Sequence, residues 1–154
     1  MIPIVPMEQL HVEAVAQLEK DCFSHPWTYA GLLEELKNPT ARFFVALQDG
    51  HVCGYAGMHH IVGECYITNV AVLPGLRRQG IGRRLMERLV LEAQREHAEM
   101  ITPEVRPSNC AAIALYQSMG FLQEGRRRNF YTDPKEDALL LTRRFLENRD
   151  IMER

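Results

Sequence analysis

The sequence predicts a mixed α/β fold in which one central sheet of seven strands is flanked by four helices. Apolar residues form seven short strand-like segments, and they recur at helical spacing in four other segments. These segments follow the order β-α-α-β-β-β-α-β-α-β-β along the chain. The strand, helix and strand in the middle of this order predict a parallel pair, joined by a right-handed crossover, at the centre of a mixed sheet.

The first elements are indicated by prolines, apolar spacing and a helix cap. Residues 2–6 predict a short edge strand because prolines flank it. Residues 10–23 predict a helix with an apolar stripe formed by Leu10, Ala14, Val15, Leu18 and Cys22. A break at residues 24–27 precedes Thr28, the expected N-cap of a second helix that ends before Pro39.

Three strand-like segments then follow, at residues 42–47, 52–61 and 64–72. Asp49-Gly50 joins the first two as a hairpin turn, since this dipeptide favours the tight turns that connect antiparallel strands. The next segment, residues 80–97, predicts a long helix. Its buried face is expected to carry Ile81, Leu85, Leu89 and Ala93.

The last part of the chain predicts a strand at residues 100–105 and a helix at residues 109–120 that is closed by a glycine. Two further strands are expected on either side of a turn at residues 132–135. We therefore expect a single domain over residues 1–146, followed by a polar tail at residues 147–154.

Composition excludes several classes of protein. The 154 residues carry a net charge of −2, which is not the strong positive balance of a nucleic-acid binder. The four cysteines are scattered and form no C-x-x-C pair, so neither a disulfide framework nor a metal site is expected. No signal peptide and no membrane span are evident. We expect a cytoplasmic protein with reduced thiols and no membrane association.

A glycine-rich segment at residues 77–82, "RRQGIG", indicates an anion site. Five arginines lie between residues 69 and 88, against the single acid Glu87. A phosphate-hydrolysing loop is excluded because Arg83 follows the glycines, and a dinucleotide turn because Leu85 replaces its third glycine. Glycines let backbone N–H groups approach a pyrophosphate at a helix N-terminus. Considered alone, the segment is equally compatible with a surface turn flanked by solvated arginines.

Two segments together, "NVAVLPGLRRQGIGRRLM" and "EVRPSNCAAIALYQSMGF", closely resemble the GNAT superfamily of acyl-CoA-dependent N-acetyltransferases. The similarity extends from "CFSHPW" to "EDALLL" and is greatest to the RimI group, which acetylates the N-terminal alanine of the eighteenth small-subunit ribosomal protein. The resemblance implies the GNAT fold with a splayed parallel pair. It also implies acetyl-CoA as co-substrate, no metal, and the N-terminal peptide of a ribosomal protein as acceptor. We expect a monomer that needs no direct contact with nucleic acid.

The resemblance implies that the main chain of a splayed strand binds the pantetheine arm, and that backbone amides of the glycine loop hold the pyrophosphate. The matching residues for the arm are Val70, Ala71, Val72 and Asn109. Those for the pyrophosphate are Arg78, Gln79, Gly80, Ile81, Gly82 and Arg83. Pro103 suits a splay because proline cannot donate a ladder hydrogen bond, although relatives often have an aliphatic residue there. The placement of the adjacent Glu104 depends on this difference.

The resemblance assigns Glu104 as general base and Tyr116 as general acid. A carboxylate suffices as base for an α-amine of pKa about 8, and a tyrosine of pKa about 10 is protonated at neutral pH. A backbone N–H of Val70 or Val72 is the expected oxyanion donor. Considered without the motif, Glu104 is better explained as a solvent-facing strand residue, Tyr116 is compatible with a core tyrosine, and Asn109 with a helix N-cap that can also be a ligand.

Phe23, Trp27 and Tyr131 match the walls of the acceptor groove in the family, although packing at loop roots is the alternative explanation. Three histidines are expected to be structural or solvated: His59, His60 and His97. Residues 126–128, three arginines, are expected at a solvated strand end. Two other functions remain open: acetylation of another amine, such as a protein lysine, a polyamine or an antibiotic, and a non-catalytic acyl-CoA-binding domain.

Overall fold

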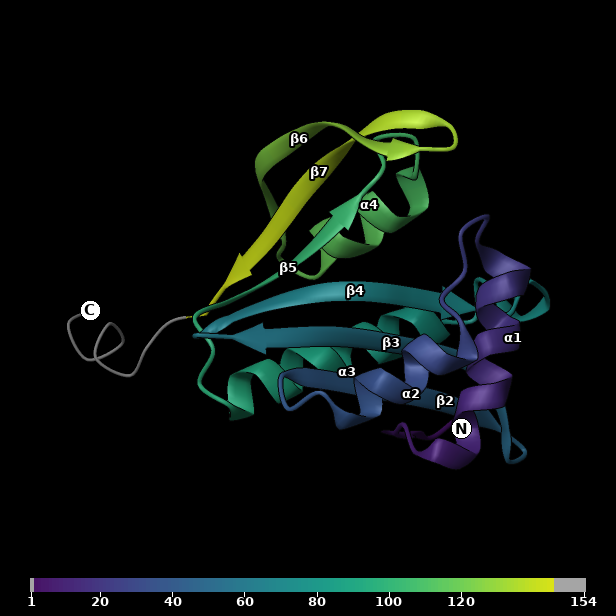
Figure 1. The fold of residues 1–154 in the computed structure, drawn as a ribbon. Coiled ribbons are helices and arrows are strands. Elements are labelled where there is room, and N and C mark those ends of the chain that lie inside the picture. The colour runs from purple at the N-terminus through teal and green to yellow at the C-terminus, as the bar shows by residue number, and fades with distance from the viewer. Residues whose placement is uncertain (1, 146–154) are drawn as a thin grey trace.

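The computed structural model describes residues 2–145, so the predicted tail at residues 147–154 lies outside it (Figure 1). Seven strands form one sheet in the order β1-β2-β3-β4-β5-β7-β6. The strands are β1 (Ile4–Pro6), β2 (Ala41–Gln48), β3 (His51–Ile61), β4 (Glu64–Val72), β5 (Met100–Val105), β6 (Leu122–Thr132) and β7 (Lys135–Arg144). The four α-helices are α1 (Val12–Cys22), α2 (Tyr29–Lys37), α3 (Ile81–Arg95) and α4 (Cys110–Ser118). This order confirms the predicted α/β pattern.

The centre of the sheet holds the predicted parallel pair. Strands β4 and β5 are parallel, whereas every other neighbouring pair is antiparallel. Their pairing covers only residues 64–67 with residues 100–103, and beyond Pro103 the two strands diverge (Figure 1). The missing N–H of proline therefore falls at the point where the parallel ladder ends. This splay opens a gap in the middle of the sheet.

A β-bulge lies on β4 where the splay begins. Gly57 of β3 pairs with Asn69, and the next residue of β3, Met58, pairs with Ile67, so that Thr68 is the extra residue. The Thr68 hydroxyl donates to the Gly57 carbonyl at 3.2 Å. A bulge bends its strand and increases the local twist, which turns the end of β4 away from the line of β5.

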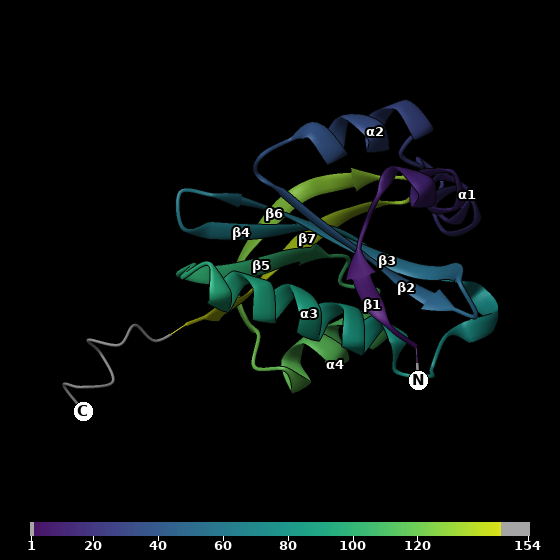
Figure 2. The same cartoon turned by 90° about the horizontal axis from the view of Figure 1, so that it is seen from below.

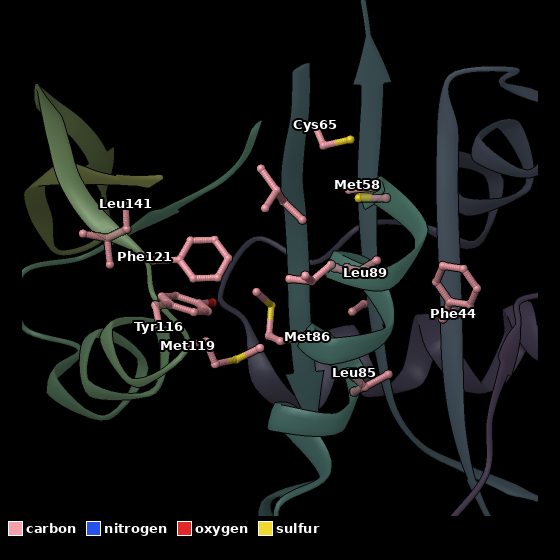
Figure 3. Packing of buried hydrophobic residues seen from close by; sticks show 14 of the residues in the cluster. Phe44, Met58, Cys65, Leu85, Met86, Leu89, Tyr116, Met119, Phe121 and Leu141 are labelled. Carbon is pink, nitrogen blue, oxygen red and sulfur yellow. The ribbon is translucent and has the colours of Figure 1, made fainter. Parts of the chain in front are cut away.

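The helices cover both faces of the sheet, with α1 and α2 on one side and α3 and α4 on the other (Figure 2). On the second side, Leu85, Met86 and Leu89 of α3 pack in one cluster with Tyr116 and Phe121 (Figure 3). All four residues predicted for the buried face of α3 are buried, namely Ile81, Leu85, Leu89 and Ala93. No helix within residues 2–145 is long and apolar enough to cross a membrane.

The predicted stripe of the first helix is partly wrong. Leu10 is 77% exposed and lies in a short 3-10 helix (Gln9–His11) before α1, and Ala14 is also exposed. The buried face of α1 consists of Val12, Val15, Ala16, Leu18 and Glu19. An apolar pattern leaves out Glu19, whose carboxylate belongs to the buried face of α1. Prediction from apolar residues alone therefore misplaces this face.

The predicted hairpin turn and helix N-caps are confirmed, and each of them is formed by a local interaction. Asp49 and Gly50 have φ of 51° and 81°, the left-handed geometry of the predicted tight hairpin turn. Thr28 accepts the Gly31 N–H at 3.0 Å as the N-cap of α2. Asn109 accepts the Ala112 N–H at 3.1 Å as the N-cap of α4, so its capping role is real.

Candidate active site

A cleft of about 510 Å³ opens where β4 and β5 diverge. Its walls come from α1 and the loop after it, from β4, β5 and α4, and from the turn between β6 and β7. Seven of the predicted site residues line it: Phe23, Trp27, Val70, Glu104, Asn109, Tyr116 and Tyr131. Ala71, Val72 and residues 78–83 are not among the lining residues. The cleft thus gathers both expected catalytic residues and all three expected acceptor residues.

Glu104 lies on β5 just beyond the last residue paired with β4, opposite Leu140 of β7. Its side chain is 25% exposed, and its Oε1 atom is 3.5 Å from Nη2 of Arg127 on β6. Glu104 therefore lines the cleft and has a cationic neighbour. Such a carboxylate can take a proton from an amine held in the cleft.

Tyr116 enters the cleft from α4, the helix that follows β5. It is only 7% exposed, and its ring lies 5.7 Å from that of Phe121 in the core (Figure 3). Burial, followed by the charge of Tyr131, raises the pKa of Tyr116 to about 12. Tyr116 is thus both a core residue and a cleft residue, and its hydroxyl keeps its proton across the range in which enzymes work.

This raised pKa predicts how the activity implied by the resemblance depends on alkaline pH. Tyr116 would be half deprotonated only near pH 12, so kcat/KM should rise until an α-amine acceptor is deprotonated at about pH 8 and then stay level to pH 10. Steady-state rates between pH 6 and pH 10, corrected for hydrolysis of the thioester without enzyme, measure this. A decline with a midpoint below pH 10 would contradict a protonated Tyr116 as the required form.

The main chain of β4 alternates in direction across the splay. The carbonyl of Ala71 lies beside Gly54 of β3, so the Ala71 main chain faces that neighbouring strand. Its neighbours Val70 and Val72 face the opposite edge, which β5 has left. The Val72 carbonyl accepts from Nε of Arg77 at 3.2 Å. Of the three β4 residues expected to contact the pantetheine arm, Ala71 therefore turns its main chain away from the cleft edge.

The glycine loop leads into the N-terminus of α3. Arg78 and Gly80 have φ of 67° and 80°, and Gly80 is the N-cap with no side-chain cap. The first N–H groups of a helix have no partner within it, so those of residues 81–83 are available to an anion. A left-handed arginine is uncommon, and such backbone strain is concentrated at binding sites.

The packing of the loop leaves room for a close ligand. A Cβ added to Gly82 would meet only Val72, at 3.8 Å, and one added to Gly80 would meet nothing within 4 Å. The protein interior therefore does not require glycine at position 82. Open space over a helix N-terminus is what a pyrophosphate needs for close approach to backbone N–H groups, so these residues fit coenzyme A.

Gly82→Ala tests this interpretation of the loop. We expect the free energy of unfolding to stay unchanged or to rise by up to about 1 kcal/mol, because alanine favours a helix over glycine. We expect KM for acetyl-CoA to rise about tenfold, equivalent to about 1.4 kcal/mol, because the added methyl group occupies the space over the loop. Chemical denaturation and steady-state kinetics measure the two quantities. An unchanged KM would show that nothing closely approaches Gly82.

The two walls expected to hold the acceptor face each other across the cleft. On one side, the ring of Trp27 is 6.1 Å from that of Phe43, so it packs on the core and also lines the cleft. On the other, the Arg106 guanidinium lies 4.2 Å above the ring of Tyr131 and pairs with Glu136 at 3.1 Å. Burial is the main cause that raises the pKa of Tyr131. Both explanations given for these aromatic residues, packing and cleft wall, apply together.

Several polar residues of the cleft were not predicted, among them Glu19 of α1 and Asn69 of β4. The only sequence signal for Glu19 is its spacing four residues after Val15 on the buried helix face. His59 and His60 lie elsewhere, as expected: His59 pairs with Glu35 at 2.6 Å and His60 with Glu96 at 2.7 Å. In the part of the chain that the structure describes, no group of acids, histidines or cysteines is arranged to hold a metal.

Comparison with known proteins identifies the family. The sequence profile of the Acetyltransferase (GNAT) family matches residues 12–121. The chain belongs to this family. It is therefore an acetyltransferase, and acetyl-CoA is its acetyl donor.

Two relatives and one solved structure are similar to this chain over most of its length. A relative from Escherichia coli strain K12, named ribosomal protein bS18-alanine N-acetyltransferase, is 34% identical over 92% of this chain and 96% of its own. A Mycobacterium tuberculosis relative named N-alpha-acetyltransferase RimI is 32% identical over 92% of both chains. The crystal structure of the ribosomal-protein-S18-alanine N-acetyltransferase from Escherichia coli superposes with a TM-score of 0.87 at 32% identity, covering 96% of this chain and 97% of that one.

Proposed function

We propose that this GNAT enzyme transfers the acetyl group of acetyl-CoA to the N-terminal α-amine of an alanine, in the small-subunit ribosomal protein that corresponds to bS18. The observation that carries the proposal is the cleft at the splay, which both Glu104 and Tyr116 line. The names of the two relatives support the choice of acceptor.

Glu104 is the proposed base. The acceptor gives up two protons, one from its ammonium form before it attacks and one as the C–N bond replaces the C–S bond. Glu104 accepts the first, directly or through one water, and the second ends on the thiol of coenzyme A. An α-amine of pKa about 8 is already partly neutral at pH 7, whereas a lysine of pKa about 10.4 is almost wholly charged. A carboxylate is therefore better matched to an α-amine than to a lysine.

Tyr116 is proposed to act in the other half of the reaction, in which the C–S bond breaks. Its pKa of about 12 exceeds the ordinary thiol value of about 8.5. Complete proton transfer to a free thiolate would thus be uphill by about 5 kcal/mol. We therefore refine the general-acid role: Tyr116 stabilises the departing sulfur chiefly as a hydrogen-bond donor. The N–H of Val70 or Val72, at the free edge of β4, is the proposed oxyanion donor.

The remaining assignments follow from the same arrangement. Asn109 and the free edge of β4 are proposed to hold the pantetheine arm, residues 78–83 the pyrophosphate, and Phe23, Trp27 and Tyr131 the acceptor peptide. Residues 1–146 are proposed to act as one domain and as a monomer. Since the proposed acceptor is a ribosomal protein, the enzyme is proposed to act in the cytoplasm.

Two synthetic peptides test the proposed function. One begins with a free alanine and contains no lysine, and the other has a blocked N-terminus and one internal lysine. After incubation with acetyl-CoA, mass spectrometry should show one acetyl group on the alanine peptide and none on the lysine peptide. Acetylation of the lysine peptide alone would refute the proposal. If neither peptide were acetylated although acetyl-CoA binds, a non-catalytic binding domain would be favoured instead.

A further inference from the structure

We propose that Glu19 is a positioning residue that ties the acceptor wall of the cleft to strand β4. The identity of the acceptor rests on the proposed function, but the link itself rests on contacts of the protein alone. Glu19 lies on α1, is fully buried, and borders the cleft. It is not one of the groups expected to touch the reacting atoms.

Three donors from three separate segments meet at the Glu19 carboxylate. Its Oε1 atom accepts the backbone N–H of Trp27 at 2.9 Å, from the loop between α1 and α2. Its Oε2 atom accepts the Tyr55 hydroxyl of β3 at 2.5 Å and Nδ2 of Asn69 of β4 at 3.0 Å. Burial and the neighbouring Glu19 charge raise the pKa of Tyr55, so that its hydroxyl remains a donor.

Burying the Glu19 carboxylate costs free energy of folding. This cost is explained if the carboxylate fixes the positions of other segments, which an apolar residue could not do. A buried carboxylate loses its hydration, and within residues 2–145 Glu19 forms no ion pair with a cation. A leucine at this position would simply extend the apolar face of α1. A carboxylate instead accepts several hydrogen bonds in fixed directions, and it thereby fixes the segments that donate them.

The segments that Glu19 fixes are those proposed to bind the acceptor and the donor. Trp27 is on the wall proposed for the acceptor. Asn69 lies between the bulge residue Thr68 and Val70, on the strand proposed for the donor. Since a misplacement of about 1 Å can cost a large factor in rate, one group that holds both sides sets how the amine meets the thioester.

The experiment uses the fact that Trp27 is the only tryptophan of the chain, so its fluorescence reports directly on this loop. Glu19→Gln keeps the shape of the side chain, but its amide NH2 group replaces one carboxylate oxygen. This NH2 group cannot accept a hydrogen bond from the donor that faces it. We expect a red shift of the emission and easier quenching by acrylamide. We also expect KM for the alanine peptide to rise at least fivefold, with KM for acetyl-CoA changing less than twofold.

Two further variants separate positioning from stability. Thr142→Val removes the buried hydrogen bond from Thr142 to Thr102, 2.8 Å long, and should lower the melting temperature without changing the fluorescence or the peptide KM. Tyr55→Phe removes one donor and leaves the carboxylate in place. It should cause smaller changes of the same sign as Glu19→Gln, and it replaces that variant if Glu19→Gln does not fold.

The proposal is overturned if Glu19→Gln, or Tyr55→Phe in its place, lowers only the melting temperature and keeps the fluorescence and peptide KM of the wild type. Failure of the proposed function is a separate result. If the wild type acetylated the lysine peptide instead, the same comparison of KM values with that peptide, together with the Trp27 emission, would still decide the role of Glu19.

Discussion

Replacing Tyr116 by phenylalanine is expected to lower kcat about 10²-fold while acetyl-CoA still binds. Phenylalanine keeps the packing against Phe121 and removes only the hydroxyl that faces the cleft. The lost contribution is the hydrogen bond to the departing sulfur, which is strongest in the transition state. Steady-state kinetics give kcat, and isothermal titration calorimetry gives the affinity for acetyl-CoA.

Tyr66→Phe is the matched control for this variant. Tyr66 lies on β4, outside the cleft, and its hydroxyl contacts Glu64, so its loss should leave kcat unchanged. A Tyr116→Phe variant with the turnover of the wild type would rule out the assigned role, whereas weakened binding of acetyl-CoA would show that the hydroxyl acts in the ground state.

Glu104→Gln is expected to lower kcat/KM for the alanine peptide about tenfold at pH 7, because the amide cannot accept the ammonium proton and only about a tenth of an α-amine of pKa about 8 is neutral there. The deficit should shrink as the pH rises above about 8, where the α-amine has already lost this proton. Rates of variant and wild type at pH 7 and pH 9 measure both effects.

Glu124→Gln provides the comparison for a lost carboxylate. Glu124 is on β6, outside the cleft, and pairs with Arg144 at 2.6 Å, so this change should not affect the rate. A Glu104→Gln deficit that is the same at pH 7 and pH 9 would show that Glu104 orients the acceptor rather than taking its proton.

The two helices that differ most in predictability show what a sequence pattern can reveal. The buried face of α3 was predicted correctly because its apolar residues recur at helical spacing along the whole helix. The face of α1 was predicted in part wrongly, because Glu19 is buried there while Leu10 and Ala14 are exposed. A buried carboxylate is stabilised by partners from distant strands, and these partners are not visible in the local sequence.

The same distinction holds for the site. Glu104, Tyr116 and the glycine loop lie in short motifs, so resemblance could select them before their positions were known. Asn69 lies next to a bulge, and the direction of the Ala71 main chain depends on register with β3. Register and bulges are set by pairing across the sheet, which a single strand sequence does not specify.

The proposed meeting point of amine and thioester lies between Glu104 and Tyr116 at the splay. A crystal structure with coenzyme A covalently joined through an acetyl linker to an alanine peptide tests this placement. We expect the pantetheine arm along the free edge of β4 and the linker between Glu104 and Tyr116. We also expect the peptide to leave between Trp27 and Tyr131. A conjugate bound with its peptide outside these walls, or with the linker away from both side chains, would contradict this placement.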